Sequence, residues 1–351
     1  MIDIKSIQTN HQILALIASI DEFKGAWKAL GQLAPEQLTA LKRVATIESI
    51  GSSTRIEGSK LSDQQVDLLL SNLSIQQFVS RDQQEVAGYA AAMNTVFEHY
   101  IDISLSENYI KQLHRDLLKY SEKDDWHRGE YKKHTNQVEA FDVNGKSVGI
   151  VFETANPFDT PFRMEALVKF TNDALNKKTV HPVLVIAVFI VEFLAIHPFQ
   201  DGNGRLSRIL TTYLLLSCGY TYVPYSSLES IIENSKEAYY LALRQTQGTL
   251  KNDQPNWHPW ILFFLRSLVN QQQRLESKVE KEKLILGNLP ELSLTILTIT
   301  KSRGRTTISD LVTITNANRN TIKKHLENLV KLNLLNKQGV KKSTWYNFAG
   351  I

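Results

Sequence analysis

The stretch HPFQDGNGRLSR, residues 197–208, is the most informative part of this sequence. It contains many polar and charged residues and directly follows sixteen mostly apolar residues, 181–196. That apolar run has the composition of a buried helix. Pro198 removes a backbone donor and disfavours helical angles at the preceding residue, so we expect the helix to end at His197. The triplet Gly202-Asn203-Gly204 then opens a second helix, where its amides would form an anion-binding nest.

The charged residues of this stretch favour a polyphosphate site over a plain turn. Arg205 and Arg208 are three positions apart in the first turn of the second helix, where cations oppose the helix dipole unless an anion is present. Asp201 supplies a hard oxygen ligand suited to Mg²⁺. His197 lies close enough in sequence to serve as a general base. A loop with a structural histidine is the alternative, but it rarely collects all these residue types within twelve positions.

At every specified position the stretch resembles the Fic-domain signature, His-Pro-Phe-x-Asp-Gly-Asn-Gly-Arg-x-x-Arg. The resemblance implies a helical Fic core that transfers AMP from ATP to a hydroxyl of a protein. It implies that His197 deprotonates the hydroxyl, that Asp201 holds Mg²⁺ on the α- and β-phosphates, and that the amides of 202–204 cradle the phosphates. Phe199 would anchor the loop. The implied ATP-binding residues are Glu57, His197, Gly202, Asn203, Gly204, Arg205, Leu206, Ser207, Arg208 and Tyr239.

A second motif lies near the amino terminus. Ser53-Thr54-Arg55-Ile56-Glu57-Gly58 resembles the inhibitory motif Ser/Thr-x-x-x-Glu-Gly/Asn of Fic proteins that carry their own inhibitory helix. By that resemblance Glu57 pairs with Arg208, takes the place of the γ-phosphate and leaves ATP misaligned. A capping or surface role for Glu57 is the alternative.

Two further segments complete the expected site. The runs VEAFDV and KSVGIVF flank Asn144-Gly145, which predicts a β-hairpin in the place of the Fic flap, where a target segment would pair by its main chain. The segment SKEAYYLALRQTQG resembles the family helix beside the nucleotide. It makes Tyr239 the expected adenosine-pocket residue, with Tyr240 and Gln247 behind it.

The carboxy-terminal segment has a different charge from the rest. Residues 288–351 carry ten Lys and Arg against three Asp and Glu, a net charge of +7, whereas the whole chain carries +4. Their pattern resembles a winged helix, with a recognition helix opening at Asn318-Arg319-Asn320 and a wing over 337–348. Such a domain binds DNA or docks on protein, and both uses stay open.

The expected fold is therefore mainly α: a helical region at 1–104 containing the motif at 53–58, a Fic core at 105–270, a helical connector at 271–288 and a winged helix at 289–351. Cys218 is the single cysteine, which excludes an intrachain disulfide, and no secretory signal is evident. We expect a cytoplasmic protein without a membrane partner. The other histidines, His114 among them, lack metal spacing and are read as structural.

Several functions stay open beside AMP transfer from ATP and Mg²⁺ to a Ser, Thr or Tyr of a protein target. The same site could transfer UMP or phosphocholine, or remove AMP. A nucleotide-sensing, DNA-binding regulator is the alternative from another class, although such a sensor has no need of the base His197. Self-modification and a homodimer are also left open.

Overall fold

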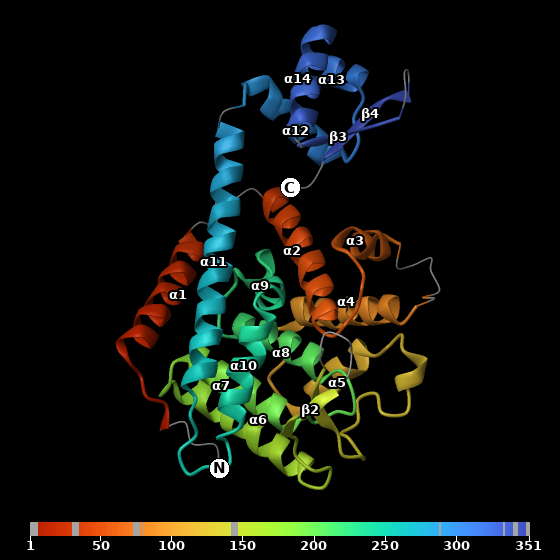
Figure 1. Ribbon diagram of the computed structural model, residues 1–351. Coiled ribbons are helices and arrows are strands. Elements are labelled where there is room, and N and C mark those ends of the chain that lie inside the picture. Colours follow the sequence, from red (N-terminus) through yellow and green to blue (C-terminus); the bar gives the residue numbers. More distant parts are fainter. Residues whose placement is uncertain are drawn as a thin grey trace. The chain divides into compact units, whose positions relative to one another are not determined.

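The computed structural model describes residues 6–29, 35–72, 78, 80–141, 147–287, 289–332, 334–339 and 343–348 (Figure 1). The chain divides into two compact units, one of residues 1–31 and 46–272 and one of residues 32–45 and 273–351. The limits at residues 45 and 272 fall inside helices, because α2 (Pro35–Ile56) and α11 (His258–Gly287) each contribute to both units. The mainly helical fold is confirmed, and the functional limits at residues 104, 270 and 288 stay predictions.

The first unit is built from helices and one hairpin. Besides parts of α2 and α11, it contains α1 (His11–Ala29), α3 (Asp63–Ser71), α4 (Arg81–His99), α5 (Glu107–Leu117), α6 (Thr160–Lys177), α7 (Pro182–Ile196), α8 (Asn203–Ser217), α9 (Leu228–Asn234) and α10 (Lys236–Gln247). Two short 3₁₀ helices, η2 (Glu122–Asp124) and η3 (Val223–Tyr225), lie between them.

Helix α7 lies at the centre of this unit. Every residue from Val183 to Ile196 is buried, and α7 packs against α6, α8 and α10. A helix that is apolar all round is stable only inside a core, where each fully buried Val, Leu, Ile or Phe contributes about 1.5–3 kcal/mol. The predicted buried helix is confirmed, and it fixes the position of His197 at its end.

Capping residues set the starts of the surrounding helices. Ser106 is the N-cap of α5 and accepts a hydrogen bond from the amide of Tyr109 at 3.2 Å, as its sequence position predicts. Ser62 and Ser80 form complete capping boxes at the starts of α3 and α4. These caps place α4 and α5 side by side against α8, next to the site.

The predicted hairpin is present. Strand β1 (Gln137–Phe141) pairs antiparallel with β2 (Ser147–Glu153), with register shifts between Val138 and Glu139 and between Ala140 and Phe141. The expected Asn144-Gly145 turn lies outside the described residues. The hairpin contacts α10, so it does not depend on a larger sheet.

The second unit contains α12 (Glu291–Arg303), α13 (Ile308–Thr315), α14 (Arg319–Lys331), β3 (Leu335–Gln338) and β4 (Trp345–Phe348). Asn318 caps α14 through the amide of Asn320, so the predicted start of that helix is confirmed. Strands β3 and β4 pair antiparallel. The winged-helix assignment stays a prediction. The core of the unit consists of Leu289, Ile296, Leu297, Leu311, Ile322, Leu326, Leu329, Leu334, Leu335 and Tyr346.

Residues 271–287, the expected helical connector, are helical and continue α11 without a break, since neither proline nor glycine interrupts the pattern before Gly287. Their role as a connector stays a prediction. Among the described residues, no helix has the length and apolar character needed to cross a bilayer.

Candidate active site

His197 is the C-cap of α7 and adopts left-handed backbone angles, φ 52° and ψ 60°. Such angles are uncommon for residues other than glycine. The amide of His197 still donates to the Phe193 carbonyl at 2.9 Å, and Pro198 cannot continue the ladder. The predicted helix end is confirmed, and the bend brings His197 to the wall of a pocket.

The imidazole of His197 has a defined tautomer. Its Nδ1 lies 3.3 Å from the Leu194 carbonyl oxygen. Because a carbonyl only accepts, Nδ1 carries the proton and Nε2 carries the lone pair. Burial lowers the pKa of His197 to about 4, and the positive charge of Lys132 acts in the same direction. The ring is therefore neutral at pH 7 and can accept a proton at Nε2.

Asn203 and Phe199 hold the loop after His197 closed. The Asn203 side chain accepts from the Phe199 amide at 2.9 Å and donates to the Phe199 carbonyl at 2.7 Å. The Phe199 ring is fully buried and stacks on His114 with 3.9 Å between the ring centroids. Phe199 is thus a buried anchor. The Asn203 side chain is used within the loop, so only its backbone amide remains for the predicted phosphate contact.

His114, on α5, supports the same loop from a second side. The Gly129 amide donates to its Nδ1 at 2.9 Å, so Nε2 carries the proton and donates to the Asp201 carbonyl at 3.0 Å. Burial lowers the pKa of His114 to about 3, which keeps the ring neutral. His114 therefore has a structural role: it fixes the backbone of Asp201, the expected metal ligand.

The two glycines of the loop meet different requirements. Gly202 is the N-cap of α8 with a positive φ of 81°, which glycine adopts without strain. Helix α8 begins at Asn203, within the predicted triplet, so residues 203–205 form the first turn, whose amides lack helical acceptors. At Gly204 a side chain would collide with the Glu57 carboxylate. Glu57 therefore lies directly against the predicted phosphate nest.

Glu57 and Arg208 form an ion pair. Arg208 Nη2 donates to Glu57 Oε1 at 2.8 Å, and Arg208 also donates from Nε to the Ser53 hydroxyl at 2.7 Å and from Nη2 to the Ser53 carbonyl at 2.9 Å. Burial acts to raise the pKa of Glu57, but the charge and hydrogen bond of Arg208 outweigh it and lower the pKa. The motif at 53–58 and the second arginine of the loop signature are thus in direct contact.

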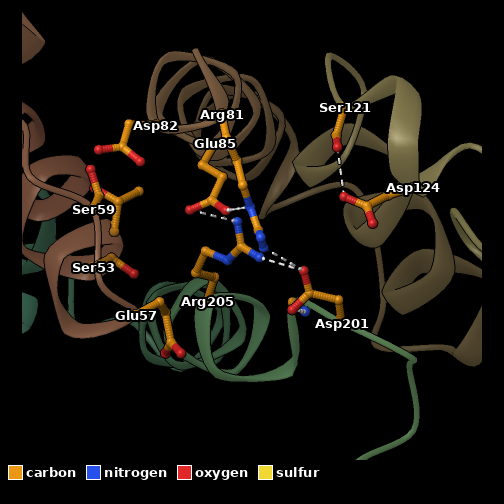
Figure 2. Close-up of polar contacts among 12 residues, drawn as sticks. Ser53, Glu57, Ser59, Arg81, Asp82, Glu85, Ser121, Asp124, Asp201 and Arg205 are labelled. Atoms are coloured by element: carbon orange, nitrogen blue, oxygen red, sulfur yellow. Dashed lines mark hydrogen bonds and ion pairs between the residues drawn. The ribbon is translucent and has the colours of Figure 1, made fainter. Parts of the chain in front are cut away.

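Arg205 belongs to a closed ring of alternating charges (Figure 2). Its Nη1 lies 3.3 Å from Glu85 Oε2, and its Nη2 donates to Asp201 Oδ2 at 3.2 Å. Arg81 completes the ring, with Nε 2.8 Å from Glu85 Oε1 and Nη2 3.4 Å from Asp201 Oδ2. The Arg205 side chain is only 3% exposed, whereas Arg81 is 61% exposed. Arg205 is therefore fixed and Arg81 can move.

A pocket of about 330 Å³ joins these groups. One wall carries His197 and the start of α8, and another carries Glu57. Tyr239 closes a third side from α10; it is buried and packs on Trp260 with ring centroids 5.8 Å apart. Tyr240 and Gln247 line the pocket as well. The pocket lining thus includes His197, Asp201, Arg205, Arg208, Glu57 and Tyr239.

Two residues of the predicted ATP-binding set are turned away. Leu206 is fully buried in the core, and Ser207 is buried with its hydroxyl donating to the Gly204 carbonyl at 2.7 Å. Neither lines the pocket. The reason is helical periodicity: on α8 the face that presents 204, 205 and 208 excludes the side chains of 206 and 207. These two side chains do not line the pocket, and nucleotide contact by residues 206 and 207 stays a prediction for their backbone.

The sequence reasoning also missed residues that line the pocket. Arg81 and Glu85 come from α4, Asn136 precedes β1 and Arg244 lies on α10. In the sequence Arg81 and Glu85 look like an ordinary i,i+4 surface pair on a helix opened by a capping box. Their distance from the loop signature along the chain concealed their place beside Asp201.

Asp201 is the candidate metal ligand. Its Oδ1 accepts from the Gly202 amide at 2.7 Å. Burial acts to raise its pKa, but Arg205, the Gly202 amide and Arg81 together lower it, so the carboxylate is ionised. No group of three or more His, Cys, Asp or Glu that could hold a metal ion occurs among the described residues. This donor set fits a hard cation that arrives with phosphate oxygens and water as its other ligands.

Comparison with known proteins gives this arrangement a family context. Residues 104–215 match the Fic/DOC family. The match runs from the start of α5 into α8 and so includes the β-hairpin and the loop of His197. The protein adenylyltransferases Fic of Drosophila melanogaster and Drosophila sechellia are each 29% identical over 208 residues, which cover 58% of this chain and 39% of the relative. The chain thus spans about two fifths of the length of these curated relatives.

Solved structures agree on the fold. A Fic family protein from Desulfovibrio desulfuricans G20 superposes with a TM-score of 0.64 at 21% identity, covering 99% of this chain and 98% of that one. A Fic domain containing signaling protein from Bacteroides thetaiotaomicron gives a TM-score of 0.60 at 25% identity, covering 73% of this chain and 95% of that one. The helical core with its hairpin is therefore a Fic-type fold.

Proposed function

We propose that this chain is a protein adenylyltransferase that moves AMP from ATP to a hydroxyl of a protein and is held inactive by Glu57. The observation that carries the proposal is the convergence on one pocket of a neutral imidazole, the first turn of α8 and Arg208 paired with Glu57. The names of the Drosophila relatives agree with this reaction. A sensor without chemistry would not need the base.

The proposed step is a phosphoryl-group displacement. The target hydroxyl oxygen attacks the α-phosphorus of ATP, the bond from that phosphorus to the bridging oxygen breaks, and pyrophosphate leaves with the electron pair. Nε2 of His197 takes the hydroxyl proton. The amides of residues 203–205 and the guanidinium of Arg208 neutralise phosphate charge. Most of the rate comes from positioning and electrostatics, as in phosphoryl transfer generally.

Asp201 would hold Mg²⁺ in this scheme. When bound, the ion would neutralise the phosphate oxygens and fix the leaving group. The protein's own contribution is to keep the carboxylate ionised and its backbone fixed through His114. To bind a cation, Asp201 must loosen its contact with Arg81, which is the exposed member of the ring.

Glu57 blocks the site in two ways. Its carboxylate forms an ion pair with the guanidinium of Arg208, which would otherwise bind the γ-phosphate. It also lies against Gly204, at the start of α8, where phosphate would approach the amides. ATP in the resting protein would therefore bind with its phosphates displaced. Loss of the carboxylate removes both obstacles while leaving His197 and Asp201 in place.

The donor and the reaction are tested together on the Glu57→Gly protein. We would incubate it with Mg²⁺ and ATP, UTP, CTP or CDP-choline and measure the mass of the intact chain and of added candidate targets. A gain of AMP from ATP alone, lost in Glu57→Gly/His197→Ala, is expected. Gain of UMP or phosphocholine instead, or removal of AMP from a pre-modified target only, would replace this proposal with the corresponding alternative.

For the second unit we propose a binding role mediated by α14. Arg319, Lys323 and Lys324 are exposed on this helix, and a basic helix of this kind suits a DNA groove. Fluorescence anisotropy with a random 30-bp duplex at 50 and 200 mM salt tests it. Affinity that falls steeply with salt and is lost in Lys323→Glu/Lys324→Glu favours DNA, whereas unchanged anisotropy favours protein docking.

A further inference from the structure

Lys132 is a buried lysine whose ammonium binds three neutral oxygens. Its side chain is 3% exposed, and Nζ donates to Asn136 Oδ1 at 2.8 Å, Thr154 Oγ1 at 2.9 Å and the Ile196 carbonyl at 3.1 Å. Within the described part of the chain, no carboxylate lies within ion-pair distance of this ammonium. Burying a cation against neutral oxygens alone is costly, so the arrangement calls for a function.

Lys132 donates hydrogen bonds to the backbone on both sides of His197. Its ammonium holds the carbonyl of Ile196, and its own backbone amide donates to the Pro198 carbonyl at 2.9 Å. His197 lies between these two peptides with a φ of 52° that non-glycine residues seldom adopt. Two hydrogen bonds from one residue therefore hold the strained turn that aims the imidazole.

The other two acceptors of Lys132 flank the β-hairpin. Asn136 precedes β1 and Thr154 follows β2, so both ends of the hairpin meet at the same ammonium. Thr154 Oγ1 also lies 2.7 Å from the Asn136 carbonyl, and the Asn136 side-chain amide donates to the Phe199 carbonyl at 2.8 Å. The hairpin and the loop of His197 thus share a single buried polar connection.

We propose that Lys132 is a positioning residue that fixes the imidazole of His197 and ties it to the base of the hairpin, so that a target segment paired with the hairpin meets the base in one geometry. This rests on the proposed transferase function, because it assigns His197 the role of base and the hairpin the role of target-binding edge. A displacement of the base by about 1 Å is enough to lower a rate by about 100-fold.

The charges around His197 agree with this geometry. Burial lowers the pKa of the imidazole to about 4, the charge of Lys132 adds to this, and Glu57 and Asp201 oppose it. Burial also lowers the pKa of Lys132 to about 8, with the charge of Arg163 acting in the same direction. Removing the ammonium should therefore raise the pKa of His197 as well as loosen its turn.

The test combines NMR with kinetics. The protein labelled with ¹³C-histidine is titrated to read the pKa of His197, and kcat, KM for the target and the Kd of ATP are measured in the Glu57→Gly background. Lys132→Met removes the hydrogen bonds of the ammonium, and Thr154→Val removes the hydroxyl that accepts one of them. Lys132→Arg keeps the charge. Lys133→Met is the matched control, because Lys133 is the exposed neighbour.

Lys132→Met is expected to lower kcat by about 100-fold, with the Kd of ATP within twofold of the parent, and to raise the pKa of His197. Thr154→Val should lower kcat by roughly 10-fold, Lys132→Arg should recover part of the loss, and Lys133→Met should match the parent. If Lys132→Met and Thr154→Val both keep the parent's kcat and His197 pKa, the proposal is overturned. Failure of Glu57→Gly to transfer AMP would reject the proposed function instead, and the titration would still decide whether Lys132 positions His197.

Discussion

Arg205 and Arg208 lie one turn apart on α8, yet the carboxylates that pair with them come from different helices and leave them different freedom. Arg208 meets Glu57, whose side chain is 32% exposed at the end of α2. Arg208 and Arg205 are themselves equally buried, at 4% and 3%. Arg205 meets Glu85, which is 11% exposed, and Asp201, which is 40% exposed. The Arg208–Glu57 pair can open on its exposed side to admit a ligand, whereas the more deeply buried Arg205–Glu85 pair is costly to break. The first is suited to regulation and the second to holding the loop.

Replacing each arginine in turn should give the largest difference in the free energy of unfolding between the regulatory pair and the loop-holding pair. Arg205→Met leaves the largely buried Glu85 with the exposed Arg81 as its only cation among the described residues, so the free energy of unfolding should fall by about 3 kcal/mol, the low end for breaking a buried pair. Arg208→Met leaves Glu57 beside solvent and should cost about 1.5–3 kcal/mol, the value of hydrogen bonds to a charged group. Urea denaturation at pH 7 measures both. An equal loss, or a larger one for Arg208→Met, would contradict the division.

Acid should act on the histidines before it acts on either ion pair. The pKa of His114 is lowered to about 3 by burial, so the unfolded chain binds a proton that the folded chain does not, and stability falls as the pH drops below 6.5. From pH 6.5 to 5 this amounts to about 2 kcal/mol for His114. The pKa values of Glu57 and Asp201 are lowered, so their contributions persist until the pH passes below the ordinary carboxyl range.

Urea denaturation at pH 7 and pH 5 measures this slope. His114→Gln should lower the slope by about half, because His197, whose pKa is lowered to about 4, contributes a similar amount, although the variant will be less stable at pH 7. His99, which is exposed on α4, provides the control, since His99→Gln should leave the slope unchanged. A slope that survives in the double variant His114→Gln/His197→Gln would place the acid sensitivity in the ion pairs after all.

Arg55 should set how firmly Glu57 is held. It binds Glu233 through Nε at 2.7 Å and Nη2 at 3.0 Å, and Asp63 through Nη1 at 2.9 Å, two residues before Glu57. Arg55→Met is expected to raise the rate of AMP transfer by roughly five-fold, equivalent to about 1 kcal/mol, and less than Glu57→Gly does. Initial rates with labelled ATP measure this, with the exposed Lys60→Met as control. A rate equal to wild type would show that Glu57 is held by Arg208 alone.

Arg81 should contribute least to stability, because it is the exposed member of the ring. Arg81→Met is expected to change the free energy of unfolding by at most about 1 kcal/mol. It should also strengthen Mn²⁺ binding to the protein with a non-hydrolysable ATP analogue, since Asp201 no longer has to leave Arg81. Electron paramagnetic resonance of Mn²⁺ reads this directly. Weaker binding would mean that Arg81 contacts the phosphates instead.

The sequence predicted the elements of this site better than its contacts. The buried helix, its end at His197 and the start of α14 followed from periodicity, Pro198 and Asn318, which act locally. The ring around Arg205 could not be foreseen, because Arg81 and Glu85 are remote in sequence and carry only an ordinary helix pattern. The side chains of Leu206 and Ser207 lie away from the pocket, which the motif alone does not show, because it names positions without telling which face of the helix they occupy.

The central claim is that Glu57 withholds Arg208 from ATP. It is tested most directly by the initial rate of AMP incorporation for wild type and Glu57→Gly at saturating ATP and Mg²⁺, with Glu57→Gly/His197→Ala as blank. Freeing a charge-assisted contact of about 1.5–3 kcal/mol predicts a rate increase of roughly 10- to 150-fold in Glu57→Gly and none in the blank. Equal rates for wild type and Glu57→Gly would contradict the account.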